Sequence, residues 1–294
     1  GGAAGGVVRG RRPGWGCEML VDSHCHLQDP KFDGDRASVL ERAREAGVST
    51  LVVVGYDVKS SRQAVDLADS DDGIYAAVGV HPHFAKDMSA KDIETLSRLA
   101  DSAKVVAVGE IGLDFYRDLS PRDVQRQAFQ EQLELARSLR LPVVIHSREA
   151  DGATFDVLAG YEREVIRKWP KDRPLGVMHC FSGDLPLALR YVELGFVISI
   201  PATCTYPGAK RTRAVACGIP LRWMAVETDA PYLPPQSQRG KRNEPAYLPQ
   251  TVRHIAELRG EPYAAVADGT AMAAAWLFGL GDIGESAATP QGVL

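Results

Sequence analysis

Eight short apolar runs recur along the chain, and they constrain its fold more than any other feature. The runs are LVDSH, TLVVVG, IYAAVGV, KVVAVGE, LPVVIH, LGVMH, GFVISI and RWMAVETD. Most are apolar at consecutive positions, which is typical of parallel strands that are covered on both faces. Helical patterns occupy the intervals. The clearest covers 121–140, where Pro121 suits the first turn and apolar residues recur every three or four positions.

Eight strand-and-helix units within about 260 residues predict a (β/α)8 TIM barrel. A doubly wound open sheet is the alternative topology for the same pattern. We expect the barrel domain to cover 19–280, because no linker or internal repeat divides this part of the chain. The glycine-rich segment 1–18 predicts a flexible extension, and 281–294 predicts a loose tail without apolar periodicity.

Composition excludes several classes of protein. No apolar run approaches the roughly 18 residues that a membrane span needs. The net charge of −4 excludes a broad positive field, so nucleic-acid binding would depend on a local basic patch or on metal ions. The five cysteines are scattered and never form a C-x-x-C pair, which predicts a protein of the reducing cytoplasm.

Polar residues that can bind metals stand at the carboxyl ends of five of the eight runs. They are His24, His26, Glu110, His146, His179 and Asp229. A single histidine at a strand end is more often structural, but all strand ends of a barrel meet at one mouth, so these six side chains should converge. Imidazole and carboxylate ligands suit magnesium, manganese, zinc or nickel, and six ligands exceed the need of one tetrahedral ion. The sequence therefore predicts two divalent ions that share a bridging carboxylate.

Seven motifs give the chain a family resemblance. MLVDSHCHL, VGVHPH, GEIGLDFY, IHSREA, HCFSG, ETDAPYLPP and RNEPAYL occur between Met19 and about Gly279. In this series the chain resembles the TatD family of metal-dependent deoxyribonucleases, a branch of the amidohydrolase superfamily. The resemblance implies a distorted barrel with a two-metal site that hydrolyses DNA phosphodiester bonds.

The resemblance also implies how the ligands divide between the ions. One ion would be held by His24, His26, Glu110 and Asp229, and the other by Glu110, His146 and His179, with Glu110 bridging. A hydroxide held on the ions would then attack phosphorus, with Asp229 as proton acceptor and Glu110 as the second catalytic residue. Because a barrel mouth is narrow, we expect an exonuclease that acts on single-stranded or frayed DNA ends.

Further residues are predicted to surround this centre. Glu227, two residues before Asp229, should face the same side and support the ligands by hydrogen bonds. Cys25 and Cys180 adjoin ligand histidines and should point the other way, toward the helices, as core thiols. Contacts to substrate phosphates are expected from His81, Arg148, Arg239, Lys241 and Arg242. The alternatives are a structural hydrogen bond for the histidine, a surface ion pair for the first arginine, and a solvated loop for the last three residues.

Two other functions fit the same pattern. One is a small-molecule amidohydrolase or phosphoesterase with the same dinuclear site. The other is a metal-loaded partner protein without catalysis, in a repair or secretion assembly. The presence of all six ligands favours an enzyme, because a binding role needs no open, charged metal site.

The chain departs from the resemblance in two places. PATCTYPGAK follows GFVISI where the family has a Ser-Gly-Ile type of stretch, and Ala273 stands where an asparagine is expected. We expect the first change to alter substrate contacts. The second should affect only helix packing or capping, away from the ligands.

Overall fold

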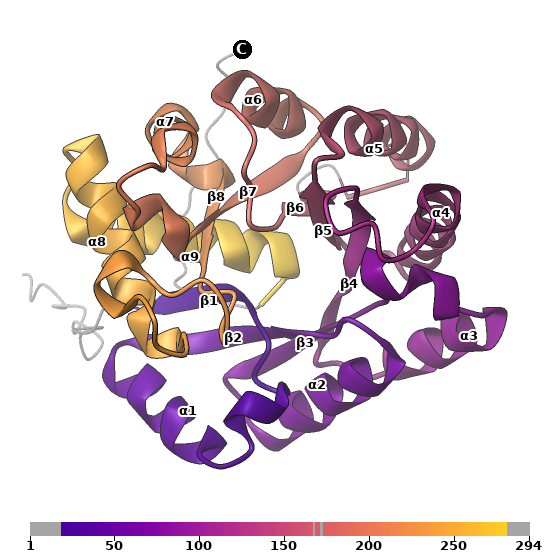
Figure 1. Ribbon diagram of the computed structural model, residues 1–294, viewed down its shortest axis with the longest axis horizontal. Helices are drawn as coiled ribbons and strands as arrows, with labels where there is room; N and C mark the ends of the chain where they lie inside the picture. Colours follow the sequence, from indigo (N-terminus) through magenta and orange to yellow (C-terminus); the bar gives the residue numbers. More distant parts are fainter. Residues whose placement is uncertain (1–18, 167, 171–172, 281–294) are drawn as a thin grey trace, which may run out of the picture.

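The structure is a computed structural model, and it describes residues 19–166, 168–170 and 173–280. Eight parallel strands form one sheet in which each strand pairs with the next along the chain (Figure 1). The strands are β1 Leu20–Cys25, β2 Val48–Val54, β3 Ile74–Val78, β4 Val105–Asp114, β5 Val143–Arg148, β6 Gly176–Met178, β7 Phe196–Pro201 and β8 Met224–Glu227. This order confirms the predicted TIM-barrel fold and excludes a doubly wound sheet, whose strand order would reverse.

The barrel is nearly closed, with an irregular seam between β8 and β1. Backbone ladders join consecutive strands from β1 to β8, and within the described residues none joins β8 back to β1. Beyond the end of β8, the Asp229 N–H donates to the His24 carbonyl at 2.9 Å, and the His26 N–H donates to the Ala230 carbonyl at 2.7 Å. The seam therefore holds the carboxyl ends of β1 and β8 side by side.

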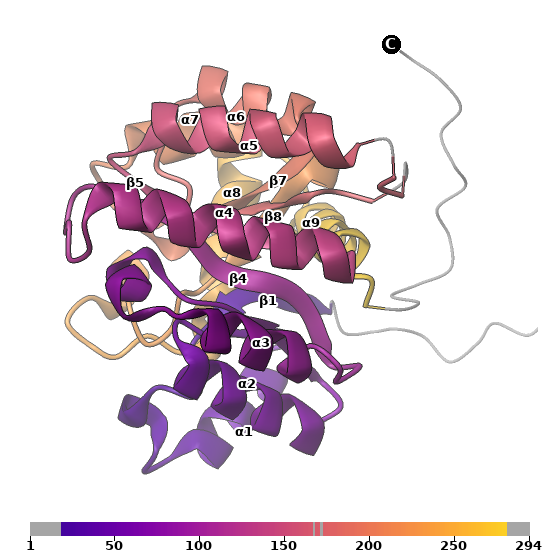
Figure 2. The same ribbon diagram turned by 90° about the vertical axis from the view of Figure 1, so that its right-hand side faces the viewer.

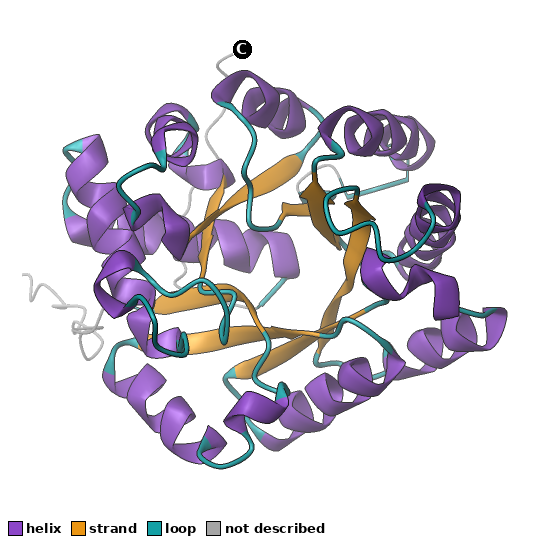
Figure 3. Cartoon of the chain, in the orientation of Figure 1, coloured by secondary structure: helices purple, strands orange, loops and turns teal. Residues whose placement is uncertain are grey.

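Helices surround the sheet (Figures 1 and 2), as the colouring by secondary structure in Figure 3 also shows. They are α1 Arg36–Glu45, α2 Val58–Ser70, α3 Ala90–Leu99, α4 Arg122–Leu139, α5 Asp151–Val165, α6 Leu185–Glu193, α7 Lys210–Gly218, α8 Leu248–Arg259 and α9 Tyr263–Phe278. The helix predicted at 121–140 is confirmed as α4, which buries Phe129 and Leu133. Asp57 and Asp184 cap α2 and α6 by accepting backbone N–H groups of the first turn.

Helix α9 closes the end of the barrel that lies opposite to the carboxyl ends of the strands. Apolar side chains of the barrel interior, such as Val52 and Val144, form one buried cluster with Leu277 of α9. Figure 1 shows this helix crossing behind the strands. Ala273, which replaces the expected asparagine, is only 2% exposed in α9, so a small side chain fits this close packing.

All strands and α-helices of the described structure lie between residues 20 and 278. None of the described helices is both long enough and apolar enough to cross a membrane. The segments 1–18 and 281–294, predicted as extension and tail, lie outside the described residues.

Candidate metal centre

The six predicted ligands lie together at the carboxyl ends of the strands. They come from β1, β4, β5, β6 and β8, or from the one or two residues that follow these strands. Five of the six side chains are buried, and His146 is partly buried. The convergence that the strand ends predict is therefore present, although the ligands are spread over more than 200 residues of sequence.

Four side chains form a first group around His24 and His26. The Nε2 atoms of the two rings are 3.2 Å apart. Asp229 Oδ1 lies 3.9 Å from Nε2 of His24 and 3.4 Å from Nε2 of His26. Glu110 Oε2 lies 3.5 Å and 3.9 Å from the same two nitrogens. Two nitrogens and two carboxylate oxygens therefore surround one point.

The other carboxylate oxygen of Glu110 faces a second group. Glu110 Oε1 lies 2.8 Å from His146 Nδ1 and 3.5 Å from His179 Nε2. His81 Nε2 also approaches this oxygen, at 3.4 Å. Glu110 therefore stands between two sets of histidines, with one oxygen directed at each set.

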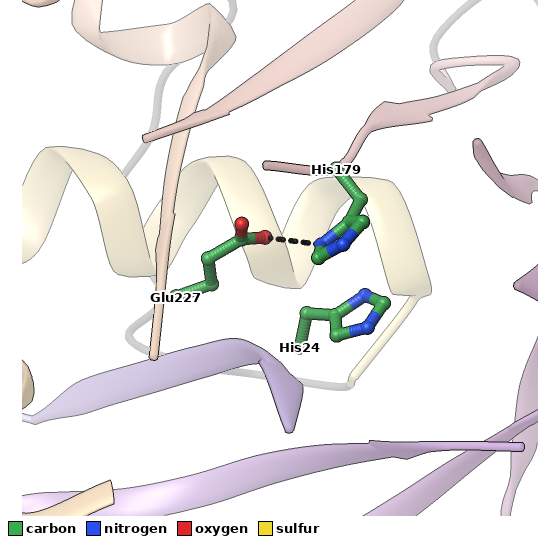
Figure 4. Close-up of side chains that lie close together, drawn as sticks. All are labelled: His24, His179 and Glu227. Carbon is green, nitrogen blue, oxygen red and sulfur yellow. Dashed lines mark hydrogen bonds and ion pairs between the residues drawn. The ribbon is translucent and has the colours of Figure 1, made fainter. Parts of the chain in front are cut away.

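Hydrogen bonds orient two of the histidines. His26 Nδ1 lies 2.8 Å from the Val54 carbonyl, and His179 Nδ1 lies 3.1 Å from Glu227 Oε2 (Figure 4). Carbonyl and carboxylate oxygens only accept hydrogen bonds, so each Nδ1 carries the proton and each Nε2 keeps its lone pair. Both lone pairs then face the groups around Glu110, which is the arrangement that metal-binding histidines require.

Glu227 also fixes the turn that follows β6. Its second oxygen accepts the backbone N–H of Cys180 at 2.7 Å, and the side chain is fully buried. The ring of His24 stacks on that of His179, with 3.5 Å between centroids, as Figure 4 shows. Glu227 thereby positions one histidine directly, and the stacked ring indirectly.

The donor set fits a divalent cation. An ion about 2.0–2.2 Å from nitrogen and oxygen ligands holds those ligand atoms roughly 3 to 3.5 Å apart. The separations in the first group, 3.2 to 3.9 Å, are close to this spacing. His24 Nδ1 is buried and has no hydrogen-bond partner within the described residues, whereas Nε2 of the same ring faces His26, Glu110 and Asp229.

The electrostatics of the site keep its carboxylates charged. Burial acts to raise the pKa of Glu110, but the surrounding histidines, His81 and His179 foremost, lower it to well below its usual range. The pKa of Asp229 is lowered in the same way, against burial, by its contact with His26. Both carboxylates are therefore ionised at neutral pH and ready to bind a cation.

His81 enters the site as a hydrogen-bond donor. Its Nδ1 accepts the backbone N–H of His83 at 3.1 Å, which places the ring proton on Nε2, the atom that faces Glu110. Burial lowers the pKa of His81 to about 4, so the ring is neutral. A neutral ring with a proton on Nε2 suits an oxygen acceptor better than a metal ion.

Asp114 is a site residue that the sequence analysis did not select. Its Oδ2 lies 2.8 Å from His83 Nε2 and 3.2 Å from His146 Nε2. Despite burial, these two histidines lower the pKa of Asp114 far below its usual range. The available signal was its place four residues after Glu110 in GEIGLDFY, since even separations along a strand face one side.

Two further residues that were not predicted from the sequence hold the backbone that follows β8. Asp22 Oδ1 accepts the N–H groups of Thr228 at 3.0 Å and of His24 at 3.3 Å. Asn243 Nδ2 donates to the carbonyl oxygens of Thr228 and Tyr232, both at 2.7 Å. Both residues stand inside the motifs MLVDSHCHL and RNEPAYL, and this was their only sequence signal.

The prediction that Cys180 points toward the helices is wrong. Strand β6 ends two residues earlier, and Cys180 has a φ of +45°, so the alternation of a strand does not extend to it. Its sulfur lies within 4.8 Å of ligand atoms of His179 and Asp229. Cys25 does lie on the helix side of β1, as a fully buried member of the main core cluster.

Three of the basic residues predicted to contact phosphates are exposed to solvent. Arg148 is exposed, and its guanidinium lies 4.0 Å from the ring centroid of Tyr116. Arg239 lies 4.8 Å from the ring centroid of Tyr206, in the PATCTYPGAK stretch. Lys241 is exposed on the same loop. The stretch that departs from the family pattern therefore contacts the basic loop.

Arg242 differs from these residues because its guanidinium is already engaged. It donates to both oxygens of Asp35 at 2.7 Å and to Glu244 at 2.8 Å. Arg42 of α1 also pairs with Glu244, at 2.8 Å. This network ties the loop after β8 to the region of α1, beside which Figure 1 shows it lying.

Fold and site together define a class of protein, a barrel hydrolase that depends on metal. The chain matches the family described as TatD related DNase over residues 21–279. It belongs to this family, as the motif series predicts.

Individual relatives agree with this assignment. The chain is 37% identical to the uncharacterized metal-dependent hydrolase YabD of Bacillus subtilis over 260 residues, 88% of this chain and 99% of that protein. It is 38% identical to the 3′–5′ ssDNA/RNA exonuclease TatD of Erwinia tasmaniensis over 269 residues, 89% of this chain and 100% of that protein. The crystal structure of the TatD homologue YjjV from Escherichia coli superimposes with a TM-score of 0.82 at 35% identity, covering 90% of this chain and 98% of that one.

Proposed function

We propose that the protein hydrolyses phosphodiester bonds at single-stranded or frayed ends of DNA, with two divalent ions. The observation that carries this proposal is Glu110, whose two oxygens face separate sets of histidines. The first ion would be held by His24, His26, Glu110 and Asp229, and the second by Glu110, His146 and His179. The exonuclease of Erwinia tasmaniensis, named for single-stranded DNA and RNA, supports this class of substrate.

Side chains of the site would divide the chemistry among them. Bound magnesium, manganese, zinc or nickel ions would supply Lewis acidity and neutralise charge on the attacking and leaving oxygens. Asp229 is ionised, so it can accept the proton of the attacking water. His81 can donate from Nε2 to a phosphate oxygen, and Glu227 keeps His179 in its ligand orientation.

End-labelled nucleic acids test the proposed function. Protein stripped of metal by a chelator would be supplied separately with magnesium, manganese, zinc or nickel, and given single-stranded DNA, blunt duplex, frayed duplex and RNA. We expect no cleavage after chelation, and shortening of single strands from one end once metal is restored. Intact oligonucleotides with all four metals, together with hydrolysis of a dihydroorotate-like amide, would instead assign the site to small molecules.

We expect mutations in the basic loop to have two different effects, on DNA binding for Arg239 and Lys241 and on stability for Arg242. We expect Arg239→Gln combined with Lys241→Gln to weaken single-stranded DNA binding and to reduce the slope of log K against log salt by about 1.4, since each phosphate contact adds roughly 0.7 for single strands. Arg242→Gln should instead lower the melting temperature, because it leaves Asp35 and Glu244 without this partner. Filter binding at several salt concentrations and thermal unfolding measure both effects. An unchanged salt slope in the double variant would contradict the phosphate contacts.

A further inference from the structure

We infer that unpaired bases of the substrate strand stack on an arc of aromatic rings at the barrel mouth. The arc consists of Tyr232, Tyr56 and Phe84, with His26 between the two tyrosines. This inference rests on the proposed function, and it names the feature by which the site would select a single strand. The rings would recognise bases without regard to sequence, because every base offers a flat face.

Exposed apolar side chains concentrate at this mouth. Nine large apolar side chains are exposed in the described part of the chain, and five of them follow β3, β4 or β8. These five are Phe84, Tyr116, Leu119, Tyr232 and Leu233. Phe84 is 39% exposed and Tyr232 is 42% exposed, so each presents a ring face or edge to solvent. Exposed aromatic side chains that gather around a polar site mark a binding surface more often than a packing defect.

The three rings form a continuous row that passes the candidate metal centre. The ring centroid of Tyr232 lies 6.1 Å from that of His26, and His26 lies 5.8 Å from Tyr56. Tyr56 in turn stacks with Phe84, with 5.9 Å between centroids and 28° between planes. Since β8, β1, β2 and β3 follow one another around the barrel, the row follows half of its rim. A base on the row would place its phosphate beside the candidate metal centre, to which His26 belongs.

Hydrogen bonds and one cation fit the arc to a nucleic-acid strand. The Tyr232 hydroxyl donates to Asp29 Oδ2 at 2.9 Å, which fixes that ring. The Phe84 N–H donates to the His81 carbonyl at 2.9 Å within a short helical turn, which fixes the other end. Lys31 Nζ lies 4.4 Å from the ring centroid of Tyr232 and is available to a phosphate. Aromatic faces beside a cation are the combination that single-strand binding proteins use.

A cycle of variants and substrates tests the inference. Phe84→Leu and Phe84→Trp would be placed in the metal-loaded Asp229→Asn protein, which should cleave slowly enough for binding to be measured. The probes are a short single-stranded DNA with 2-aminopurine at its terminal positions, and the same strand with abasic residues there. We expect Phe84→Leu to weaken binding of the normal strand by about 5- to 100-fold and to reduce quenching of 2-aminopurine. Phe84→Trp should restore both.

The abasic strand separates stacking from a general structural effect. It should bind weakly to the parent protein and lose no further affinity on Phe84→Leu, because no base is present to stack. Ile166→Ala, which removes an exposed apolar side chain at the other end of the barrel, should change neither strand. Equal losses on the two strands, or full affinity of Phe84→Leu for the normal strand, would overturn the inference.

A second pair of variants and a separate cleavage assay complete the test. If Phe84→Leu unfolds, Tyr232→Leu and Tyr232→Phe repeat the comparison at the other end of the arc, and only the leucine variant should lose base-dependent affinity. Cleavage by the wild-type protein is scored separately. If the protein binds single strands through these rings but cleaves none, the proposed nuclease function is wrong and base stacking still holds. If the protein cleaves single strands and loss of the rings does not weaken binding, base stacking is wrong and the nuclease function still holds.

Discussion

Glu110→Gln is expected to reduce bound metal from two equivalents to one or none and to lower turnover by at least about 10³-fold. Glutamine has nearly the same shape, but it replaces one oxygen with an NH₂ donor and removes the negative charge between the two sets of histidines. Ions that supply several kcal/mol of transition-state stabilisation are then lost, and each 1.36 kcal/mol corresponds to a factor of about ten in rate.

Elemental analysis after metal reconstitution measures the first effect, and end-labelled single-stranded DNA measures the second. Glu94→Gln is the matched control, because Glu94 is an exposed carboxylate on α3, remote from the mouth. Wild-type protein and this control should both bind close to two equivalents. Two equivalents in Glu110→Gln would show that this carboxylate does not bridge the ions.

Asp229→Asn should keep most of the metal but lower turnover by roughly 10² to 10⁴, the usual contribution of a general base. Asparagine retains one oxygen that can bind an ion and loses the charge and basicity of the carboxylate. The backbone of this position should stay in place, because its N–H group, and not its side chain, pairs with the His24 carbonyl across the seam.

Saturating metal must be present in this assay, so that lost affinity for the ion is not mistaken for lost catalysis. Metal content is determined on the same samples. If fully loaded Asp229→Asn cleaves DNA within about threefold of the wild-type rate, Asp229 is only a ligand. Glu110 would then be the next residue to test as proton acceptor.

Hydrogen bonds from two buried side chains hold the backbone around Asp229 and His24 at the seam. Asp22 and Asn243 contact the backbone on either side of Asp229, and Asp22 also holds the backbone of His24. Asp22 therefore joins β1 to Thr228, the residue after β8, and Asn243 braces the backbone on both sides of Asp229. Both side chains are fully buried. The predicted ligands from the first and last strands meet because the bond from Asp22 and the backbone bonds across the seam replace the missing ladder.

Much of the fold was predictable because it follows from local patterns. Continuous apolar runs separated by helical patterns identify covered parallel strands, and eight such units leave few topologies. The convergence of the six predicted ligands followed from one rule, that the strands of a barrel end at one mouth. Helix α4 followed from its periodicity and from Pro121.

Other features of the site depend on contacts between residues that lie far apart in the chain. Cys180 faces the site because its positive φ ends the alternation of β6. Asp114 joins the site because His83, in the short helical turn after β3, and His146 of β5 approach it. Arg242 is engaged by Asp35, which lies more than 200 residues earlier in the sequence.

The sequence by itself therefore determined the barrel, the mouth at which the predicted ligands meet and the family of the protein. Periodicity and motif order depend on neighbouring residues, and both can be read along the chain. Only the tertiary structure decided that the two oxygens of Glu110 face different histidines, and that aromatic rings from three loops form one row. Both arrangements depend on how side chains from different strands and loops are oriented toward one another. Contacts and hydrogen bonds between residues far apart in sequence set these orientations.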